Sequence, residues 1–204
     1  MTTRRYEQRL RAESAEATRA RILDAVYERV RATPTRPVSV EEIARAARVA
    51  RSTVYQVFGS RAGLFDALAA DVLRRGGFER VTAAVAHPDA REHLRQAFRA
   101  GMEVYAVYRD VHRVLFSTSA VDPEATAGAM RRADEARAGG MEYLARRLAE
   151  QDALRPGLSA DDAAHVLFVL TGFEAFDALY TGRGLPVDDV ARLIVLAAEN
   201  AVCR

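Results

Sequence analysis

The sequence predicts an all-α protein. Half of its 204 residues are apolar, which is ample to bury a core. β-branched residues never gather into the alternating runs that are typical of strands. Apolar residues recur instead at intervals of three and four, the spacing that brings side chains to one face of a helix. We therefore expect helices along nearly the whole chain, separated by short segments that contain proline or glycine.

The first helix is predicted from about residue 16 to residue 31. Its expected buried stripe consists of Ile22, Leu23, Val26, Tyr27 and Val30. Pro34 and Pro37 then prevent the helix from continuing.

A second helix is predicted to begin at Val40 and to run to about Ala47. Ser39 and Glu42 have the spacing of a capping box, in which a hydroxyl and a carboxylate each accept a hydrogen bond from a free backbone N–H group. Its expected buried side consists of Ile43, Ala44 and Ala47.

A third short helix, from Arg51 to Phe58, follows after the three residues Arg48, Val49 and Ala50. Two short helices joined by such a turn have the dimensions of a helix-turn-helix. The expected inner side consists of Val54, Val57 and Phe58. The expected outer face consists of Ser52 and Gln56, flanked by Arg51, Thr53 and Tyr55. Hydrogen-bonding groups of this kind suit base edges and phosphates.

A break at Gly59 and Ser60 separates that helix from the next one. Ser60 is expected to cap the new helix, and Arg61 lies in its first turn. A helix N-terminus and a guanidinium group both attract a phosphate.

The chain changes character beyond Gly76 and Gly77. Further helices are predicted near residues 89–108, 111–119, 123–153, 160–181 and 187–202, between segments that carry Pro or Gly with a capping Ser or Asp. The predicted organisation is a three-helix DNA-binding domain at residues 1–62 and a helical body at residues 63–204.

Charge is unevenly distributed along the chain. All thirty basic residues are arginines, and the net charge of +2 conceals +6 over residues 1–62 and −4 over the rest. The basic end is therefore the candidate for meeting a polyanion. Arg4, Arg5, Arg9 and Arg11 precede the first predicted helix. Two interpretations of them remain open, an arm that reaches the minor groove or a phosphate, and a solvated, frayed terminus.

The sequence also indicates a compartment. Cys203 is the only cysteine, so neither an internal disulfide nor a cysteine metal cluster is expected. The N-terminus lacks the apolar stretch of a signal peptide, and the longest apolar run, near residues 166–170, is far too short to span a bilayer. We expect a soluble, cytoplasmic protein.

The chain resembles the TetR (tetracycline-repressor) family of bacterial transcription regulators. The resemblance is carried by TRARILDAVYE, from Thr18 to Glu28, and by VSVEEIARAARVARSTVYQVFGSRAGLFDAL, from Val38 to Leu68. It implies a homodimer on a palindromic operator, a repressor role, and a ligand cavity in the C-terminal body that controls release from DNA. The DNA-contacting residues that it implies are Ser39, Arg51, Ser52, Thr53, Tyr55, Gln56 and Arg61.

Two positions depart from the pattern of that family. Arg48 stands in the turn where the family usually has glycine, so the turn either has a conformation open to arginine or carries strain. Ala50 replaces the usual Ser or Thr before the recognition helix, which removes a side-chain cap worth ~1 kcal/mol.

Aromatic and methionine side chains gather on the middle helices. Ordinary core packing accounts for any one of them, but as a set they exceed what a helical bundle needs. We therefore also expect a cavity for a mostly apolar small molecule, in which Tyr105 and His112 supply hydrogen bonds. Its predicted lining consists of Phe98, Met102, Tyr105, His112, Phe116, Phe168 and Phe173.

The last two predicted helices, within residues 160–202, indicate a homodimer. Both carry apolar residues over too much of their circumference to cover a single body. An antiparallel two-fold pairing with a second copy would form a four-helix bundle and set two recognition helices roughly 34–36 Å apart, about one turn of DNA.

No catalytic residues are predicted. The four histidines lack metal-ligand spacing, and neither a nucleophile elbow nor a phosphate-binding glycine loop occurs. We therefore expect no enzyme activity, no cofactor and no metal. The alternative is a helical-bundle enzyme or small-molecule carrier with an incidental helix-turn-helix, which salt-dependent binding to duplex DNA would separate from a regulator.

Overall fold

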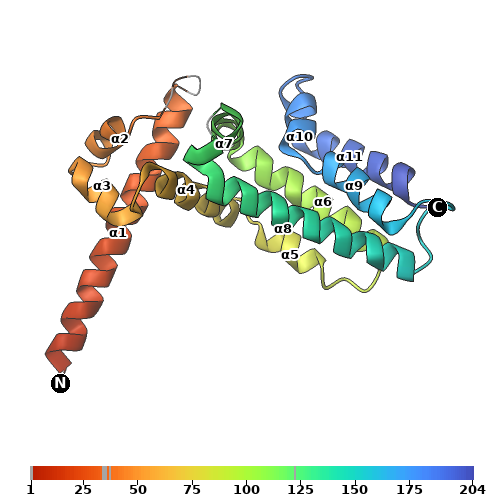
Figure 1. Cartoon of the computed structure of the whole chain (residues 1–204), viewed down its shortest axis with the longest axis horizontal. Helices are drawn as coiled ribbons and strands as arrows, with labels where there is room; N and C mark the ends of the chain where they lie inside the picture. The colour runs from red at the N-terminus through yellow and green to blue at the C-terminus, as the bar shows by residue number, and fades with distance from the viewer. Residues whose placement is uncertain (1, 34–35, 37, 122) are drawn as a thin grey trace. The chain divides into compact units, whose positions relative to one another are not determined.

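The computed structural model describes residues 2–33, 36, 38–121 and 123–204 (Figure 1). Within these ranges all regular secondary structure is helical, apart from one isolated bridge between Leu154 and Cys203. The helices are α1 (Thr2–Ala32), α2 (Val40–Ala46), α3 (Arg51–Phe58), α4 (Arg61–Arg75), α5 (Glu79–Ala84), α6 (Ala90–Val107), α7 (Arg109–Val121), α8 (Pro123–Glu150), α9 (Ala160–Leu170), α10 (Phe173–Tyr180) and α11 (Val187–Val202). The all-α prediction is confirmed.

The chain divides into two compact units. Unit 1 comprises Met1–Ala70 and Arg113–Met130, and unit 2 comprises Asp71–His112 and Arg131–Arg204. The helices α4, α7 and α8 each contribute residues to both units.

The core of unit 1 includes the apolar stripe of α1, which packs against α2 and α3. All five predicted stripe residues are buried, with Ile22 fully so and Tyr27 the most exposed at 5%. Ile43, Ala44 and Ala47 are also buried. The helical period in the sequence therefore gives the correct inner faces of both helices.

The first helix starts earlier than predicted. It begins at Thr2, so the arginines at positions 4, 5, 9 and 11 lie within α1 and do not precede it. Residues 2–17 are rich in Arg, Glu and Ala, which are good helix formers, and Arg9 pairs with Glu13 one turn later at 2.8 Å. In Figure 1 this part of α1 extends beyond α2 and α3, and the side chains described there are exposed.

The predicted capping box at the start of α2 is wrong. Ser39 occupies the N-cap position with extended backbone, but its side chain makes no capping hydrogen bond. Glu42 instead accepts a hydrogen bond from Nε of Arg29 on α1, at 2.9 Å, and this bond lowers the pKa of the Glu42 carboxyl. A guanidinium group is a stronger donor than a neutral backbone amide, so the carboxylate joins two helices and does not cap one.

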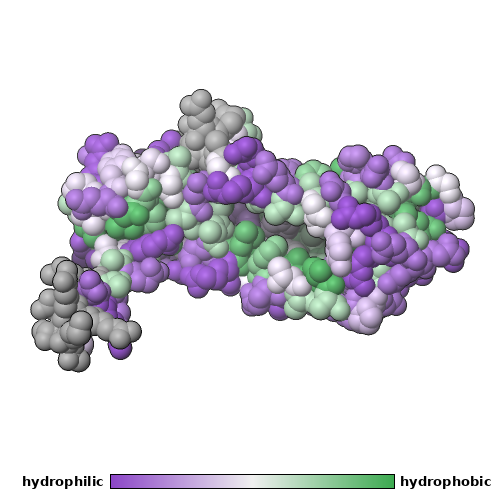
Figure 2. Space-filling model, turned by 60° about the horizontal axis from the view of Figure 1, so that its bottom comes forward, coloured by the Kyte–Doolittle hydropathy of each residue, from purple (hydrophilic) through white to green (hydrophobic). Residues whose placement is uncertain are grey.

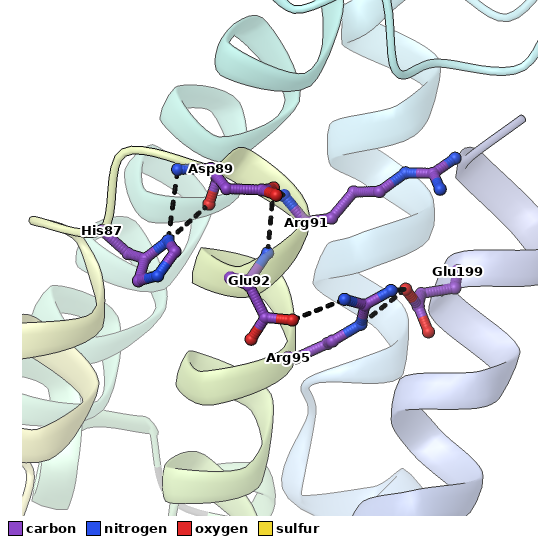
Figure 3. Close-up of polar contacts among 6 residues, drawn as sticks. All are labelled: His87, Asp89, Arg91, Glu92, Arg95 and Glu199. Carbon is purple, nitrogen blue, oxygen red and sulfur yellow. Dashed lines mark hydrogen bonds and ion pairs between the residues drawn. The ribbon is translucent and has the colours of Figure 1, made fainter.

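In unit 2, α6 packs against α5 and α11, and α11 also packs against α9 and α10 (Figure 1). Asp89 caps α6 by accepting hydrogen bonds from the backbone N–H groups of Arg91 and Glu92, at 2.7 and 3.2 Å. Figure 3 shows this cap beside Arg95, which joins Glu92 of its own helix to Glu199 of α11. These bonds fix the start of α6 and its register against α11.

Arg147 of α8 holds the connection between α5 and α6. Its guanidinium donates to the backbone carbonyls of Val85, His87 and Pro88, at 3.3, 2.7 and 2.7 Å. It also lies 3.3 Å from Nδ1 of His93. Burial, with Arg147 nearby, lowers the pKa of His93 to about 4. His93 and His112 are the two buried histidines among the described residues.

The helix predicted over residues 160–181 is broken. α9 ends at Leu170, and α10 begins at Phe173 after a bend of 44°. The Thr171 hydroxyl donates back to the Leu167 carbonyl at 2.9 Å, and Gly172 has extended backbone, so α9 ends here and α10 begins after Gly172. Among the described residues no single helix is long and apolar enough to cross a membrane, although α9 and α10 pass that test as a bent pair.

The remaining C-terminal predictions agree with the helices observed, to within a few residues at each end. α5 was not expected. On the face shown in Figure 2, hydrophilic residues predominate and hydrophobic residues form smaller areas between them.

Candidate nucleic-acid interface

The turn between α2 and α3 contains an arginine in a glycine-like conformation. Arg48 has φ of +55°, in the left-handed region. Its N–H donates to the Arg45 carbonyl at 3.1 Å, and the next N–H, of Val49, donates to Ala44 at 2.9 Å. The turn therefore keeps the backbone geometry that favours glycine, and Arg48 carries the strain. Ala50 is the N-cap residue of α3 and makes no side-chain capping bond, as the sequence predicts.

Helix α3 has a buried side and an exposed side. Val54 is 1% exposed, whereas Arg51, Ser52 and Gln56 are exposed. Thr53 and Tyr55 are half-buried on the flanks. Val57 and Phe58, predicted to face inward, keep part of their surface exposed, and the Arg19 guanidinium lies 5.3 Å from the centre of the Phe58 ring.

Arg51 and Tyr55 form a pair on the exposed side of α3. A terminal nitrogen of Arg51 lies 3.5 Å from the Tyr55 hydroxyl, and the guanidinium carbon lies 5.6 Å from the ring centre. The hydrogen bond to Tyr55 raises the pKa of Arg51. The pair holds a permanent positive charge and a phenol side by side, a combination that can bind a phosphate oxygen.

The break before α4 is built by Gly59, Ser60 and Gly63. Gly59 has φ of +76° and ends α3, and Ser60 Oγ accepts a hydrogen bond from the Gly63 N–H at 2.9 Å. A Cβ atom on Gly63 would lie 2.0 Å from the Phe58 carbonyl oxygen, so a larger residue cannot fit there. The predicted cap by Ser60 is confirmed. Arg61 is the first residue of α4, with its guanidinium 5.3 Å from the centre of the Phe65 ring.

The predicted DNA-contacting residues come from the starts of α2 and α4 and from α3 between them. Ser39 is the N-cap of α2, and Arg61 opens α4. The other five lie in α3. The geometry is that of a helix-turn-helix, in which the second helix, α3, buries Val54 on one side and exposes polar residues on the other. Contact of these side chains with DNA stays a prediction.

In unit 2 the structure brings three of the predicted ligand residues together. Ring centres of Tyr105 and His112 lie 5.0 Å apart, those of Tyr105 and Phe173 5.4 Å, and those of His112 and Phe173 5.8 Å. Sequence reasoning left two members of this cluster out of the predicted lining. Phe176 lies 5.6 Å from Tyr105, and Tyr180 stacks on Phe176 at 4.9 Å. Their spacing of three and four along α10 was the available signal.

The other predicted ligand residues lie in different surroundings. Phe98 and Met102 are each 1% exposed on α6. Phe168 packs beneath Arg137 of α8, whose guanidinium lies 3.6 Å from the ring centre and donates to the Phe168 carbonyl at 2.5 Å. Phe116 belongs to unit 1. A cavity that all seven line together stays a prediction.

The helix-turn-helix and the chain as a whole are similar to known proteins. Residues 22–68, which span the helix-turn-helix, match the family model described as bacterial regulatory proteins, tetR family. Over nearly its whole length the chain is also similar to the solved structure of NalD from Pseudomonas aeruginosa, the secondary repressor of the MexAB-OprM multidrug efflux pump. The identity is 25% and the TM-score 0.71, covering 94% of this chain and 98% of NalD. The chain is a TetR-family transcriptional regulator.

Two further solved structures share the fold of this TetR-family regulator. PfmR from Thermus thermophilus, a TetR-family transcriptional regulator, is 16% identical with a TM-score of 0.69, covering 88% of this chain and 97% of that one. The ketosteroid transcriptional regulator KstR2 of Mycobacterium tuberculosis is 17% identical with a TM-score of 0.65, covering 91% and 95%. None of the curated proteins compared with the chain matches it.

The prediction that the chain belongs to the TetR family is therefore confirmed, and it is a DNA-binding regulator and not an enzyme. Within the described parts of the chain, no group of three or more His, Cys, Asp or Glu side chains is placed to hold a metal ion.

Proposed function

We propose that this regulator is a repressor that binds a palindromic operator as a homodimer and is released by a mostly apolar small molecule. The observation that carries the DNA-binding part is the exposed polar side of α3, opposite the buried Val54. A repressor role is supported by NalD, which is a repressor and is 25% identical to this chain.

Specificity and affinity would come from different residues. Ser52 and Gln56 are exposed on α3 and suit base edges, since an amide can bond adenine through both its donor and its acceptor. Arg61, Tyr55 and Thr53 suit phosphates, which fix position without reading sequence. The +6 charge of residues 1–62 supports binding to a polyanion.

The homodimer would form through residues 160–202. Two large apolar side chains in this region are exposed, Val169 at 69% on α9 and Leu196 at 48% on α11. α9 and α11 pack against each other, so both side chains belong to one pair of helices. A two-fold pairing of these helices would bury them.

The test of DNA binding begins with selection of bound duplexes from a random pool, which we expect to yield a palindrome. Gln56→Ala should then relax preference at one base-pair position at a cost of ~1–3 kcal/mol. Arg61→Ala should weaken all sequences alike and flatten the salt slope by about one unit per half-site. Gln96→Ala and Arg99→Ala, exposed positions on α6, are the matched controls.

Two outcomes would contradict this assignment. An unchanged selected sequence for Gln56→Ala would remove the recognition role of α3. Absence of salt-dependent binding to any duplex would instead refute the proposed role at a palindromic operator.

The dimer is tested by sedimentation. We expect a dimer at micromolar concentration, and we expect Leu196→Glu to shift it toward monomer because a carboxylate cannot be buried unpaired at low cost. Val107→Glu, at a 54% exposed valine of α6, is the matched control. A monomeric parent protein would refute the proposed interface.

A further inference from the structure

His112 contains a buried polar atom that the fold leaves without a partner. The residue is 5% exposed, and its Nε2 atom makes no hydrogen bond to any residue that the structure describes. Buried polar atoms of proteins are nearly always hydrogen-bonded, because leaving one unbonded costs free energy. Nε2 of His112 therefore requires an explanation.

The other nitrogen of the same ring is already engaged. The ring donates a hydrogen bond to the backbone at Val104, in the last turn of α6. Since Nε2 has no partner, the donor is Nδ1, which carries the proton. In this tautomer Nε2 presents a bare lone pair, so it can only accept a hydrogen bond.

The rings that lie beside that lone pair are aromatic and uncharged. The ring meets the edge of Tyr105 at an interplanar angle of 89° and lies beside Phe173. Burial lowers the pKa of His112 to about 4, and no neighbouring charge contributes to that shift. The imidazole is therefore neutral near pH 7, and it offers a charged ligand group no counter-charge.

Tyr105 does not compete for the lone pair. Its hydroxyl donates to the Thr171 carbonyl at 3.2 Å, at the junction of α9 and α10. Burial of that hydroxyl raises the pKa of Tyr105 to about 12, so it stays protonated and keeps this bond.

We infer that Nε2 of His112 is the acceptor for a neutral hydroxyl or N–H group of an aromatic ligand that binds against Tyr105 and Phe173. This inference rests on the proposed ligand-controlled function and specifies the ligand class. Carboxylates are excluded, because a carboxylate has no proton to donate and its lone pairs would face that of Nε2. Aromatic faces and edges suit a flat guest, and the single acceptor orients it.

The test uses matched probes and the DNA-free protein. 2-Naphthol and indole carry the required donor, and 2-methoxynaphthalene and 1-methylindole are their partners without it. By calorimetry we expect each donor to bind roughly tenfold more tightly than its methylated partner, the effect of one buried hydrogen bond. 2-Naphthoate should bind more weakly than 2-naphthol.

His112→Phe tests the residue. It keeps a ring but removes the acceptor, so the preference for donor over methylated probe should disappear. His93→Phe removes the other buried histidine, outside the aromatic cluster, and should retain the preference. Because His112→Phe also loses the bond to Val104, a second measurement uses the unmodified protein. Nitrogen NMR of labelled histidine should show the Nε2 resonance of His112 moving to that of a hydrogen-bonded acceptor on addition of 2-naphthol, and not on addition of 2-methoxynaphthalene.

Three results would overturn the inference: equal affinity of donor and methylated probes, failure of both donors to bind, or an Nε2 resonance that already shows an accepted hydrogen bond and does not respond, which indicates a bound water only. Each leaves the DNA-binding proposal intact, because operator selection is measured separately. A protein that fails to bind DNA but still prefers the donor probes would contradict the DNA-binding proposal and support this inference.

Discussion

Replacing Arg48 with glycine should stabilise the protein. The left-handed conformation of Arg48, with φ of +55°, costs a residue with a Cβ atom about 1–2 kcal/mol. Glycine removes that strain but loses more backbone entropy on folding, about 0.5–1 kcal/mol. The Arg48 side chain is exposed, so its removal sacrifices little packing. The balance is an increase of roughly 0.5–1 kcal/mol in the free energy of unfolding.

Arg45→Gly is the matched control, because it removes the same exposed side chain three residues earlier but from the last turn of α2. Glycine inside a helix costs about 1 kcal/mol, so the two variants should differ by roughly 1.5–2 kcal/mol in opposite directions. Urea denaturation followed by circular dichroism measures both, with an unchanged m-value as the check that the unfolded states are comparable. Equal destabilisation by both substitutions would refute the strain at Arg48.

Three further perturbations have expected outcomes. Ser60→Ala should cost about 1 kcal/mol by removing the cap of α4, whereas Ser39→Ala, at an N-cap without a side-chain bond, should cost much less in the same urea titration. Arg147→Met should lower the free energy of unfolding by about 2 kcal/mol, because three backbone carbonyls lose a charged donor. Arg146→Met, at the exposed neighbouring position, is the control. The free energy of unfolding should fall as the pH drops from about 6.5 to about 4, by up to ~1.4 kcal/mol per pH unit for each buried histidine. Over this range histidines of the unfolded chain bind protons, whereas the buried rings of His93 and His112 stay neutral. Unfolding free energies that stay flat over this window would contradict the buried, neutral state of both rings.

The helix-turn-helix could be predicted because its signals are local. Apolar spacing gives the inner faces of α1 and α2, and the turn and the Ser60 cap depend on residues within a few positions of each other. The capping box failed for the opposite reason. Arg29, which captures the Glu42 carboxylate, precedes it by thirteen residues, and only the packing of α1 against α2 brings the two together.

The aromatic cluster of unit 2 could be predicted only in part. Residue type selects Tyr105, His112 and Phe173. Tyr105 and His112 lie close together in sequence, on either side of the break between α6 and α7, but Phe173 comes from α10, which is distant in sequence. The break at Thr171 and Gly172 was missed, since the apolar pattern continues through it. That break orients α10 and so decides that Phe176 joins the cluster.

His112 holds the end of α6 to the beginning of α7. Tyr108 interrupts the helix between them, with φ of −127°, and the His112 N–H donates to the Tyr108 carbonyl at 3.0 Å while its ring bonds the backbone at Val104. The next residue, Arg113, already belongs to unit 1. A hydrogen-bond donor at Nε2 would stabilise the tautomer that makes the Val104 bond, and would therefore stabilise this link between the end of α6 and the first turn of α7.

One hydrogen bond is too weak to control release from DNA. It supplies about 0.5–1.5 kcal/mol, whereas moving a two-state equilibrium from 1:99 to 99:1 requires about 5.5 kcal/mol of differential binding. Contacts between the ligand and the surrounding rings must supply most of the difference, and they must be better in one state than in the other. The hydroxyl or N–H group of the ligand would then select which ligand binds, and the contacts with Tyr105 and Phe173 would determine whether that ligand releases the protein from its operator.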